Sequence, residues 1–145
     1  MTTRIATGWL AGLLLAALSL APATAAADKT FFYNITSDDT WQAGMAVSHA
    51  TAALEAGHEV ALYLNVRGVR LVATDGEPDV FGPTGKTPRA MIRAAADKGA
   101  RVLMCHMCVK KAGLTMDDLI EAAERARADA IFELMADDDT VVMSY

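Results

Sequence analysis

Cys105 and Cys108 are the side chains in this sequence whose type and spacing are best suited to chemistry, and they are its only cysteines. They form a single Cys-x-x-Cys motif in the segment Leu-Met-Cys-His-Met-Cys, residues 103–108. A disulfide between them would close a very short loop and stabilise the fold little. A cysteine thiolate, in contrast, is a nucleophile and a ligand for soft metals. We therefore expect a chemical role for the pair rather than a structural bridge.

The neighbouring residues place the motif where a strand ends and a helix begins. Residues 101–104 are typical of a short buried strand, and a short helix is predicted over 107–112. In open α/β sheets, sites form at the carboxyl ends of strands. Backbone N–H groups at the start of a helix also favour the thiolate. Cys105 is therefore the better candidate for the reactive thiol. Three basic side chains close by in the sequence could add positive charge: His106, Lys110 and Lys111.

Three kinds of chemistry fit the motif. In the first, Cys105 accepts a sulfane sulfur as a persulfide, and Cys108 resolves the persulfide by forming a disulfide. In the second, the pair exchanges disulfides, although a thioredoxin-type protein carries this motif earlier in its chain. In the third, the thiolates bind Cu(I). The candidate co-ligands for copper are His106, Met107 and Met104. Inert buried thiols are the remaining interpretation.

Zinc fits the sequence less well than copper. A structural zinc site needs four ligands. Besides the cysteine pair the chain offers His49, His58 and His106, with no second Cys-x-x-Cys and no His-x-x-x-His motif. We expect no zinc and no other resident cofactor, with copper as the alternative.

The first 25 residues read as a secretory signal. Arg4 supplies the basic start, Leu10 to Leu20 supply an apolar stretch, and residues 23–25 read Ala-Thr-Ala, a cleavage signal. The apolar stretch is short for a membrane span, which needs about 20 residues. We expect cleavage after Ala25, a periplasmic location and no lasting membrane insertion.

The expected mature domain, residues 26–145, is of common single-domain size. It carries 12 basic and 18 acidic residues, a net charge of −6, because the signal contains one base and no acid. This balance argues against nucleic-acid binding, which requires a basic face.

Alternating apolar runs and helical patterns indicate a doubly wound α/β domain with a parallel sheet. The predicted strands are residues 30–35, 58–66, 101–104 and 140–144. The predicted helices, besides 107–112, are residues 40–56, 89–98 and 115–128. The last helix is expected to begin at a capping box at Thr115 and to bury Leu119, Ile120, Ala123 and Ala126. Residues 68–72 could be extended or helical, and residues 74–88 are expected to be a mobile or functional loop.

Two stretches resemble the DsrE/DsrF-like family of small sulfur-relay proteins. The more specific is residues 101–115, Arg-Val-Leu-Met-Cys-His-Met-Cys-Val-Lys-Lys-Ala-Gly-Leu-Thr, followed by Asp-Asp-Leu-Ile at 117–120. The other, residues 53–60, is similar to the end of the family's first helix and the start of its second strand. The resemblance implies a flavodoxin-like three-layer α/β/α sandwich with a mostly parallel sheet, assembled as a trimer or hexamer.

The resemblance also implies a role for each cysteine. In the family's sulfurtransferases a cysteine at the end of this strand carries persulfide sulfur, a role that falls on Cys105, eight residues before Gly113. Cys108 matches a second cysteine found in many relatives. The implied partners are sulfur donor and acceptor proteins or small sulfur compounds. Family sulfur relays work in the cytoplasm, so export leaves the acceptor open, and the residues between the cysteines keep copper binding as the alternative.

Overall fold

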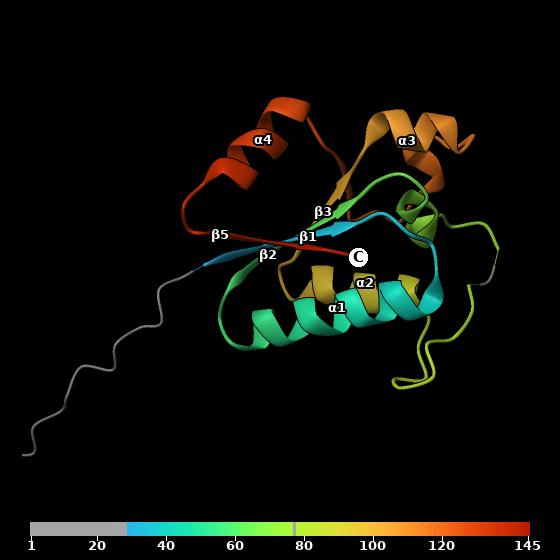
Figure 1. Ribbon diagram of the computed structural model, residues 1–145. Coiled ribbons are helices and arrows are strands. Elements are labelled where there is room, and N and C mark those ends of the chain that lie inside the picture. The colour runs from blue at the N-terminus through green and yellow to red at the C-terminus, as the bar shows by residue number, and fades with distance from the viewer. Residues whose placement is uncertain (1–28, 77) are drawn as a thin grey trace, which may run out of the picture.

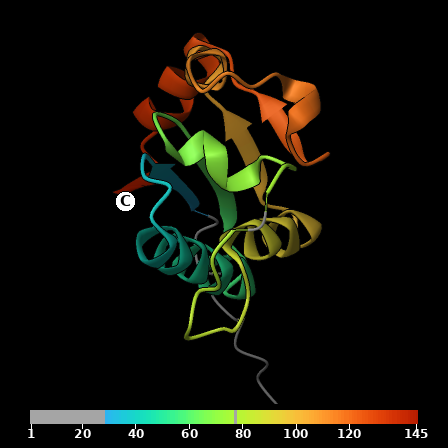
Figure 2. The ribbon, with the colours of Figure 1, turned by 90° about the vertical axis from the view of Figure 1, so that its right-hand side faces the viewer.

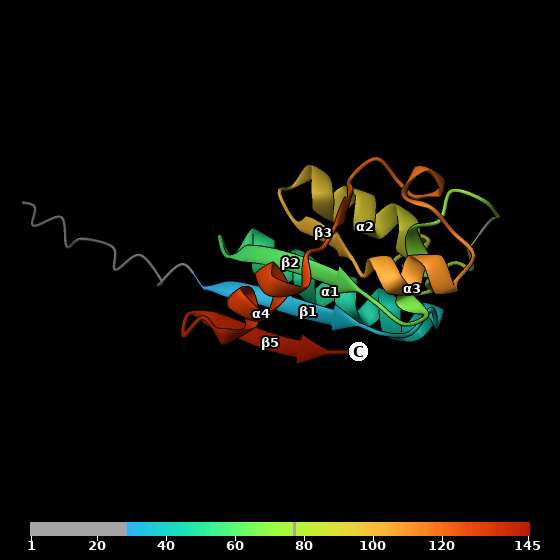
Figure 3. The same ribbon diagram turned by 90° about the horizontal axis from the view of Figure 1, so that it is seen from above.

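The protein is built on a five-stranded parallel sheet. In the computed structural model, which describes residues 29–76 and 78–145, the strand order is β4-β3-β2-β1-β5 and every neighbouring pair is parallel (Figures 1 and 3). The strands are β1 (Thr30–Ile35), β2 (Glu59–Leu64), β3 (Arg101–Met104), β4 (Ala123–Arg125) and β5 (Thr140–Ser144). The predicted signal peptide, residues 1–25, lies outside the described residues.

Helices lie on both sides of the sheet (Figures 1 and 2). Helices α1 (Thr40–Glu55) and α2 (Pro88–Asp97) cover one face. Helices α3 (His106–Lys111) and α4 (Ala128–Ala136) lie on the other side, with α3 near the carboxyl ends of the strands. The predicted flavodoxin-like α/β/α sandwich is therefore confirmed. No helix within the described residues is long and apolar enough to cross a membrane.

The main core fills the space between the sheet and helices α1 and α2. Tyr33, Leu62 and Met104 point to this side of the sheet and are almost completely buried. Four alanines of α1 are also buried, so that the helix lies close to the strands. A smaller cluster on the opposite face joins three strand residues to α4; its members are Phe32, Ala61, Leu103 and Ile131. The two faces of the sheet are therefore unequally covered.

Side-chain caps explain where the two long helices begin. The Asp39 carboxylate accepts the Gln42 N–H at 2.9 Å, and the Thr87 hydroxyl accepts the Ala90 N–H at 3.2 Å. Such caps satisfy N–H groups that have no partner within the helix. The predicted bounds of α1 and α2 were correct to within one residue at each end.

The predicted helix over residues 115–128 was wrong. The capping box is present, since Asp118 accepts the Thr115 N–H at 2.8 Å, but it opens only the 3₁₀ turn η2 (Met116–Asp118). Leu119 and Ile120 then enter the main core, and the chain continues as β4 beside β3. A strand here covers the edge of β3. Tertiary packing therefore overrides the local helical pattern.

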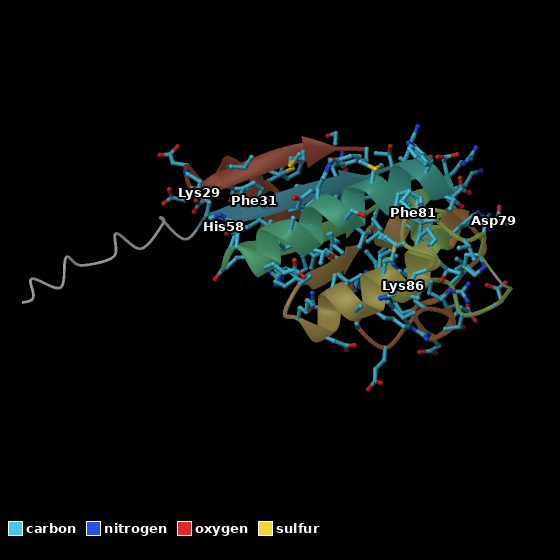
Figure 4. The ribbon with its side chains drawn as sticks, turned by 90° about the horizontal axis from the view of Figure 1, so that it is seen from below. Lys29, Phe31, His58, Asp79, Phe81 and Lys86 are labelled. Carbon is cyan, nitrogen blue, oxygen red and sulfur yellow. The ribbon has the colours of Figure 1, made fainter. Side chains whose placement is uncertain are left out.

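The segment between η1 (Gly68–Val72) and α2 is fastened to α1 by an aromatic side chain. Phe81 is only 2% exposed and lies on the α1–α2 side of the sheet, near Lys86, with which it forms a β-bridge (Figure 4). Its ring fills the space where a side chain of Gly44 would be, since a Cβ there would lie 2.3 Å from Cγ of Phe81. The edge of the Trp41 ring covers it, with 5.4 Å between ring centroids. The expected loop thus has a buried anchor.

Candidate functional site

Cys105 lies at the carboxyl end of β3 and caps the start of α3. Its N–H donates to the Leu64 carbonyl at 3.0 Å, which continues the ladder with β2, and its own carbonyl accepts the Val109 N–H of α3 at 3.0 Å. Because side chains alternate along a strand, Cys105 is on the same face as Leu103, whereas Met104 is buried in the main core. Cys105 and Cys108 are both free, half-buried thiols. The structure therefore brings the two predicted residues together.

Hydrogen bonds favour the thiolate of Cys105. Burial opposes ionisation, but donors to the sulfur outweigh it and lower the pKa of Cys105 below its ordinary value. The groups that lower this pKa are, in order of effect, the Cys108 side chain, the Cys108 N–H, the Tyr63 hydroxyl and the Met107 N–H. Hydrogen bonding to the charged form is a recognised cause of a depressed pKa. The reactivity of Cys105 stays a prediction, and the lowered pKa is in keeping with it.

Two neighbouring groups hold their protons more tightly. Burial, followed by donation to Cys105, raises the pKa of the Cys108 thiol. Burial and then the hydrogen bond to Cys105 raise the pKa of Tyr63 to about 12. Of the three side chains, Cys105 ionises first. Cys108 and Tyr63 keep their protons and favour the Cys105 thiolate. The two thiols therefore differ in how readily they ionise.

The turn after β2 contacts Cys108 through its backbone. Val66 has a positive φ of 47°, which is unusual for a β-branched residue, and its backbone N–H favours the Cys108 thiolate, against the larger effect of burial. Two residues on, a Cβ at Gly68 would lie 2.3 Å from the Ile35 carbonyl oxygen. The turn therefore passes over the end of β1 because residue 68 has no side chain.

The same turn places the positively charged Arg67 near Cys108. Arg67 pairs with Asp38 at 2.5 Å, and Asp38 precedes the capping residue of α1. The Asp38 carboxylate, followed in effect by Asp39, raises the pKa of Arg67. Asp39 caps α1, and Asp38 is connected to the site only through Arg67.

A surface pocket of about 480 Å³ opens beside Cys108. Three basic side chains, three apolar residues and Cys108 line it: Val66, Arg67, Arg70, Met107, Cys108, Lys111 and Ala112. Arg70 comes from η1, and its guanidinium donates to the Ala112 carbonyl at 3.2 Å. The three cations of the pocket therefore come from the β2–η1 turn (Arg67), from η1 (Arg70) and from α3 (Lys111).

The basic residues within and after the motif act differently from the expectation. His106 has a lowered pKa because of burial and then the positive charges of Arg125 and Lys110, so it is neutral at neutral pH. None of His106, Lys110 and Lys111 is among the groups that lower the pKa of Cys105. The pKa of Cys105 is thus lowered by hydrogen bonds and not by these basic side chains.

The possible metal ligands are dispersed, apart from the cysteines and their neighbours. Met104 faces the main core, away from Cys105, while Met107 is 81% exposed beside the cysteines. His49, on α1, contacts the Tyr145 hydroxyl, and His58 packs against Phe31 at the opposite end of the sheet (Figure 4). Within the described part of the chain, no three His, Cys, Asp or Glu side chains are grouped to hold a metal ion.

Sequence reasoning missed Tyr63, Val66, Arg67 and Arg70. Tyr63 lies inside an apolar strand and reads as a core residue, and only the pairing of β2 with β3 puts it beside Cys105. A signal for Arg67 was present, because it follows β2 directly and strand ends form sites in such sheets. Nothing in the sequence places Arg70 near α3.

Comparisons with known proteins agree on family and fold. The sequence model of the DsrE/DsrF-like family matches residues 28–143. The crystal structure of the YchN protein from E. coli superposes with a TM-score of 0.68 at 16% identity, covering 81% of this chain and 99% of that one. The structure of MTH1491, a protein of unknown function from Methanobacterium thermoautotrophicum, gives a TM-score of 0.64 at 16% identity, covering 81% and 100%. No curated protein sequence matches the chain.

Proposed function

This chain belongs to the DsrE/DsrF-like family, and on that premise we propose that it carries sulfane sulfur as a persulfide on Cys105, with Cys108 as the partner thiol. The observation that carries the proposal is the position of Cys105, a free thiol between the carboxyl end of β3 and the start of α3, with the free thiol of Cys108 in the first turn of that helix. The thiolate is the nucleophilic form of cysteine, and the lowered pKa of Cys105 favours it.

The loading step needs only this thiolate and a sulfane-sulfur donor. Cys105–S⁻ attacks the outer sulfur of a persulfide R–S–SH, the S–S bond of the donor breaks, and R–S⁻ leaves with the bonding electron pair. The product is Cys105–S–SH, and the outer sulfur keeps its proton. An acceptor thiolate takes the sulfur in the same way, with the Cys105 thiolate as leaving group.

Cys108 provides a second way to discharge the persulfide. Its thiolate attacks the inner sulfur of Cys105–S–SH, a Cys105–Cys108 disulfide forms, and HS⁻ leaves. The sulfane sulfur is reduced to sulfide and the two cysteines are oxidised. Burial, and then the interaction with Cys105, raise the pKa of the Cys108 thiol, so Cys108 forms its thiolate less readily than an ordinary cysteine does.

We further propose that the protein acts in the periplasm after removal of residues 1–25, and that its partners are sulfur donors and acceptors of that compartment. The Arg4 start, the apolar stretch and the Ala-Thr-Ala sequence support export. N-terminal sequencing of the protein from a periplasmic extract tests this, with Ala26 as the expected first residue.

Peptide-resolved mass spectrometry after treatment with a sulfane-sulfur donor tests the persulfide. We expect an adduct of about 32 Da, one sulfur atom, on Cys105 of the wild-type protein. Cys108→Ser retains the adduct and Cys105→Ser loses it. An adduct on Cys108 that persists in Cys105→Ser would contradict the assignment of Cys105.

A second candidate function uses the same two sulfurs. Because the Cys108 side chain donates to Cys105, both sulfurs lie within reach of one soft ion, and the exposed Met107 thioether adjoins them. Thiolates and thioethers are ligands that select Cu(I). Anaerobic titration with Cu(I) tests this function. One ion per chain, with uptake lost in either cysteine variant and weakened in Met107→Leu, would support copper binding over sulfur transfer.

A further inference from the structure

The pocket beside Cys108 combines positive charge with apolar surface. Its cations come from Arg67, Arg70 and Lys111, and its apolar lining comes from Val66, Met107 and Ala112. Cys108 is part of its wall, and the Cys108 side chain donates to the Cys105 sulfur. A ligand in this pocket is thus separated from the reactive thiol by one side chain.

The charge in the pocket is only partly neutralised. Asp38 pairs with Arg67, but the described residues place no carboxylate within ion-pair distance of Arg70 or Lys111. The chain as a whole has a net charge of −5. A cationic pocket on an acidic protein attracts small anions locally while the rest of the surface repels them.

We propose that this pocket binds a low-molecular-weight organic persulfide that carries an anionic group. Arg70 and Lys111 hold the anionic group, the apolar lining holds the organic part, and the sulfane sulfur lies at Cys108 next to Cys105. The inference rests on the proposed function, which requires a sulfane sulfur, and adds the chemical class of its donor. Thiosulfate, an inorganic source with the same anion-plus-sulfane chemistry, is the alternative source.

Both sources deliver the same atom. With an organic persulfide, Cys105–S⁻ takes the outer sulfur and R–S⁻ leaves. With thiosulfate, Cys105–S⁻ attacks the outer sulfur of S–SO₃²⁻, the S–S bond breaks, sulfite leaves with the electron pair, and Cys105–S–S⁻ remains. The leaving group is an anion in both cases, so the cations also stabilise the departing charge.

Paired alkylating reagents test the pocket without requiring sulfur transfer. Iodoacetate is anionic and iodoacetamide is neutral, and both react with the same thiolate, so their rate ratio is independent of the thiol pKa. We expect the rate with iodoacetate divided by the rate with iodoacetamide to be several-fold higher at Cys105 and Cys108 than for free cysteine at low salt. Peptide mapping resolves the two cysteines. The excess falls as salt screens the charges.

Charge-removing variants locate this preference. Lys111→Gln and Arg70→Gln lower the ratio toward that of free cysteine, whereas Lys110→Gln, the neighbouring lysine outside the pocket lining, leaves it unchanged. Arg70→Gln also loses the hydrogen bond to the Ala112 carbonyl, so its fold is checked by circular dichroism. If Arg70→Gln does not fold, the result for Lys111→Gln decides the test. A wild-type ratio equal to that of free cysteine, or an equal drop in Lys110→Gln, overturns the inference.

Loading rates separate this inference from the proposed function. With glutathione persulfide we expect Lys111→Gln to raise the KM for persulfide formation several-fold with little change in kcat, and thiosulfate to react more slowly. Equal loading of wild type and Lys111→Gln by glutathione persulfide overturns the donor class while the persulfide function stands. If the alkylation rates show a preference for the anionic reagent but neither sulfur source forms a persulfide, the proposed function is contradicted. The pocket would then be only an anion-binding site.

Discussion

Four hydrogen-bonding groups lower the pKa of Cys105, and only one of them is a side chain from another strand. Two are backbone N–H groups of α3 and one is the Cys108 thiol, whereas Tyr63 reaches across from β2. Hydrogen bonds to an ionised group are stronger than those to a neutral one. The Tyr63 hydroxyl is therefore the donor whose removal tests the electrostatics of the thiol without changing the Cys-x-x-Cys motif.

Replacing Tyr63 by Phe should raise the pKa of Cys105. In the wild type that pKa is lowered, so the alkylation rate of Cys105 rises with pH and reaches its plateau below the pH at which an ordinary cysteine does. Without the hydroxyl the rate profile moves to higher pH, and alkylation at neutral pH slows several-fold. Iodoacetamide kinetics read at the Cys105 peptide measure this change.

Tyr145→Phe is the matched control. It also removes one tyrosine hydroxyl, but this hydroxyl contacts His49 on α1 rather than the cysteines. Its pH–rate profile should overlay that of the wild type. Overlapping profiles for Tyr63→Phe and the wild type would show that Tyr63 does not contribute to the thiolate.

At the scale of elements, the turn between β2 and η1 positions much of the site. It presents the Val66 N–H to Cys108 and brings Arg67 and Arg70 to the pocket. Its close approach to the end of β1 depends on Gly68, where any side chain would collide with a backbone oxygen. The Ile35 carbonyl oxygen cannot rotate away as a side chain can. In a variant with a side chain at residue 68, the turn itself must therefore move away from β1.

Gly68→Ala should therefore destabilise the fold and loosen the site. We expect a loss of about 1–3 kcal/mol, the usual range for an overpacked position. Urea unfolding measures it. Gly82→Ala is the control, since a Cβ at Gly82 meets nothing within 4 Å and its stability should be nearly unchanged. Equal stability of the two variants would contradict the close packing at residue 68.

Elements defined by local sequence were predictable, and those defined by distant contacts were not. Strands β1, β3 and β5 begin and end at the predicted residues, since each is a short apolar run between polar segments. The helix predicted for residues 115–128 was wrong because burial of Leu119 and Ile120, and pairing of β4 with β3, decide that segment. For the same reason the Cys-x-x-Cys motif at the strand end could be predicted from local sequence, whereas the positions of Tyr63 and Arg70 beside it could not.

At the scale of the molecule, the two faces of the sheet differ in what they leave exposed. The face covered by α4 has a core of four residues, and large apolar side chains next to it are exposed. Phe132 is 71% exposed, Met135 on the same helix is 42% exposed, and Val142 on β5 is 42% exposed. Val142 is the register partner of Phe32 in that small core. Large apolar side chains left exposed on one face of a sheet are typical of an interaction surface.

We propose that this surface joins copies of the chain, in line with the trimer or hexamer that the family resemblance implies. Phe132→Asp should then reduce the mass measured by light scattering after size-exclusion chromatography to that of a smaller assembly or monomer. Val80→Asp, the same kind of change at an exposed residue outside α4 and β5, should leave the mass unaltered. A monomeric wild-type protein would contradict the proposal.

The central claim is that Cys105 carries one sulfane sulfur, and its most direct test is sulfur stoichiometry at that residue. After treatment with glutathione persulfide and desalting, mass spectrometry should show one added sulfur, about 32 Da, on the Cys105 peptide. Cyanide should then remove it as thiocyanate and restore the original mass. The adduct should survive in Cys108→Ser and be absent in Cys105→Ser. An unmodified Cys105 peptide in the fully reduced wild-type protein would contradict the claim.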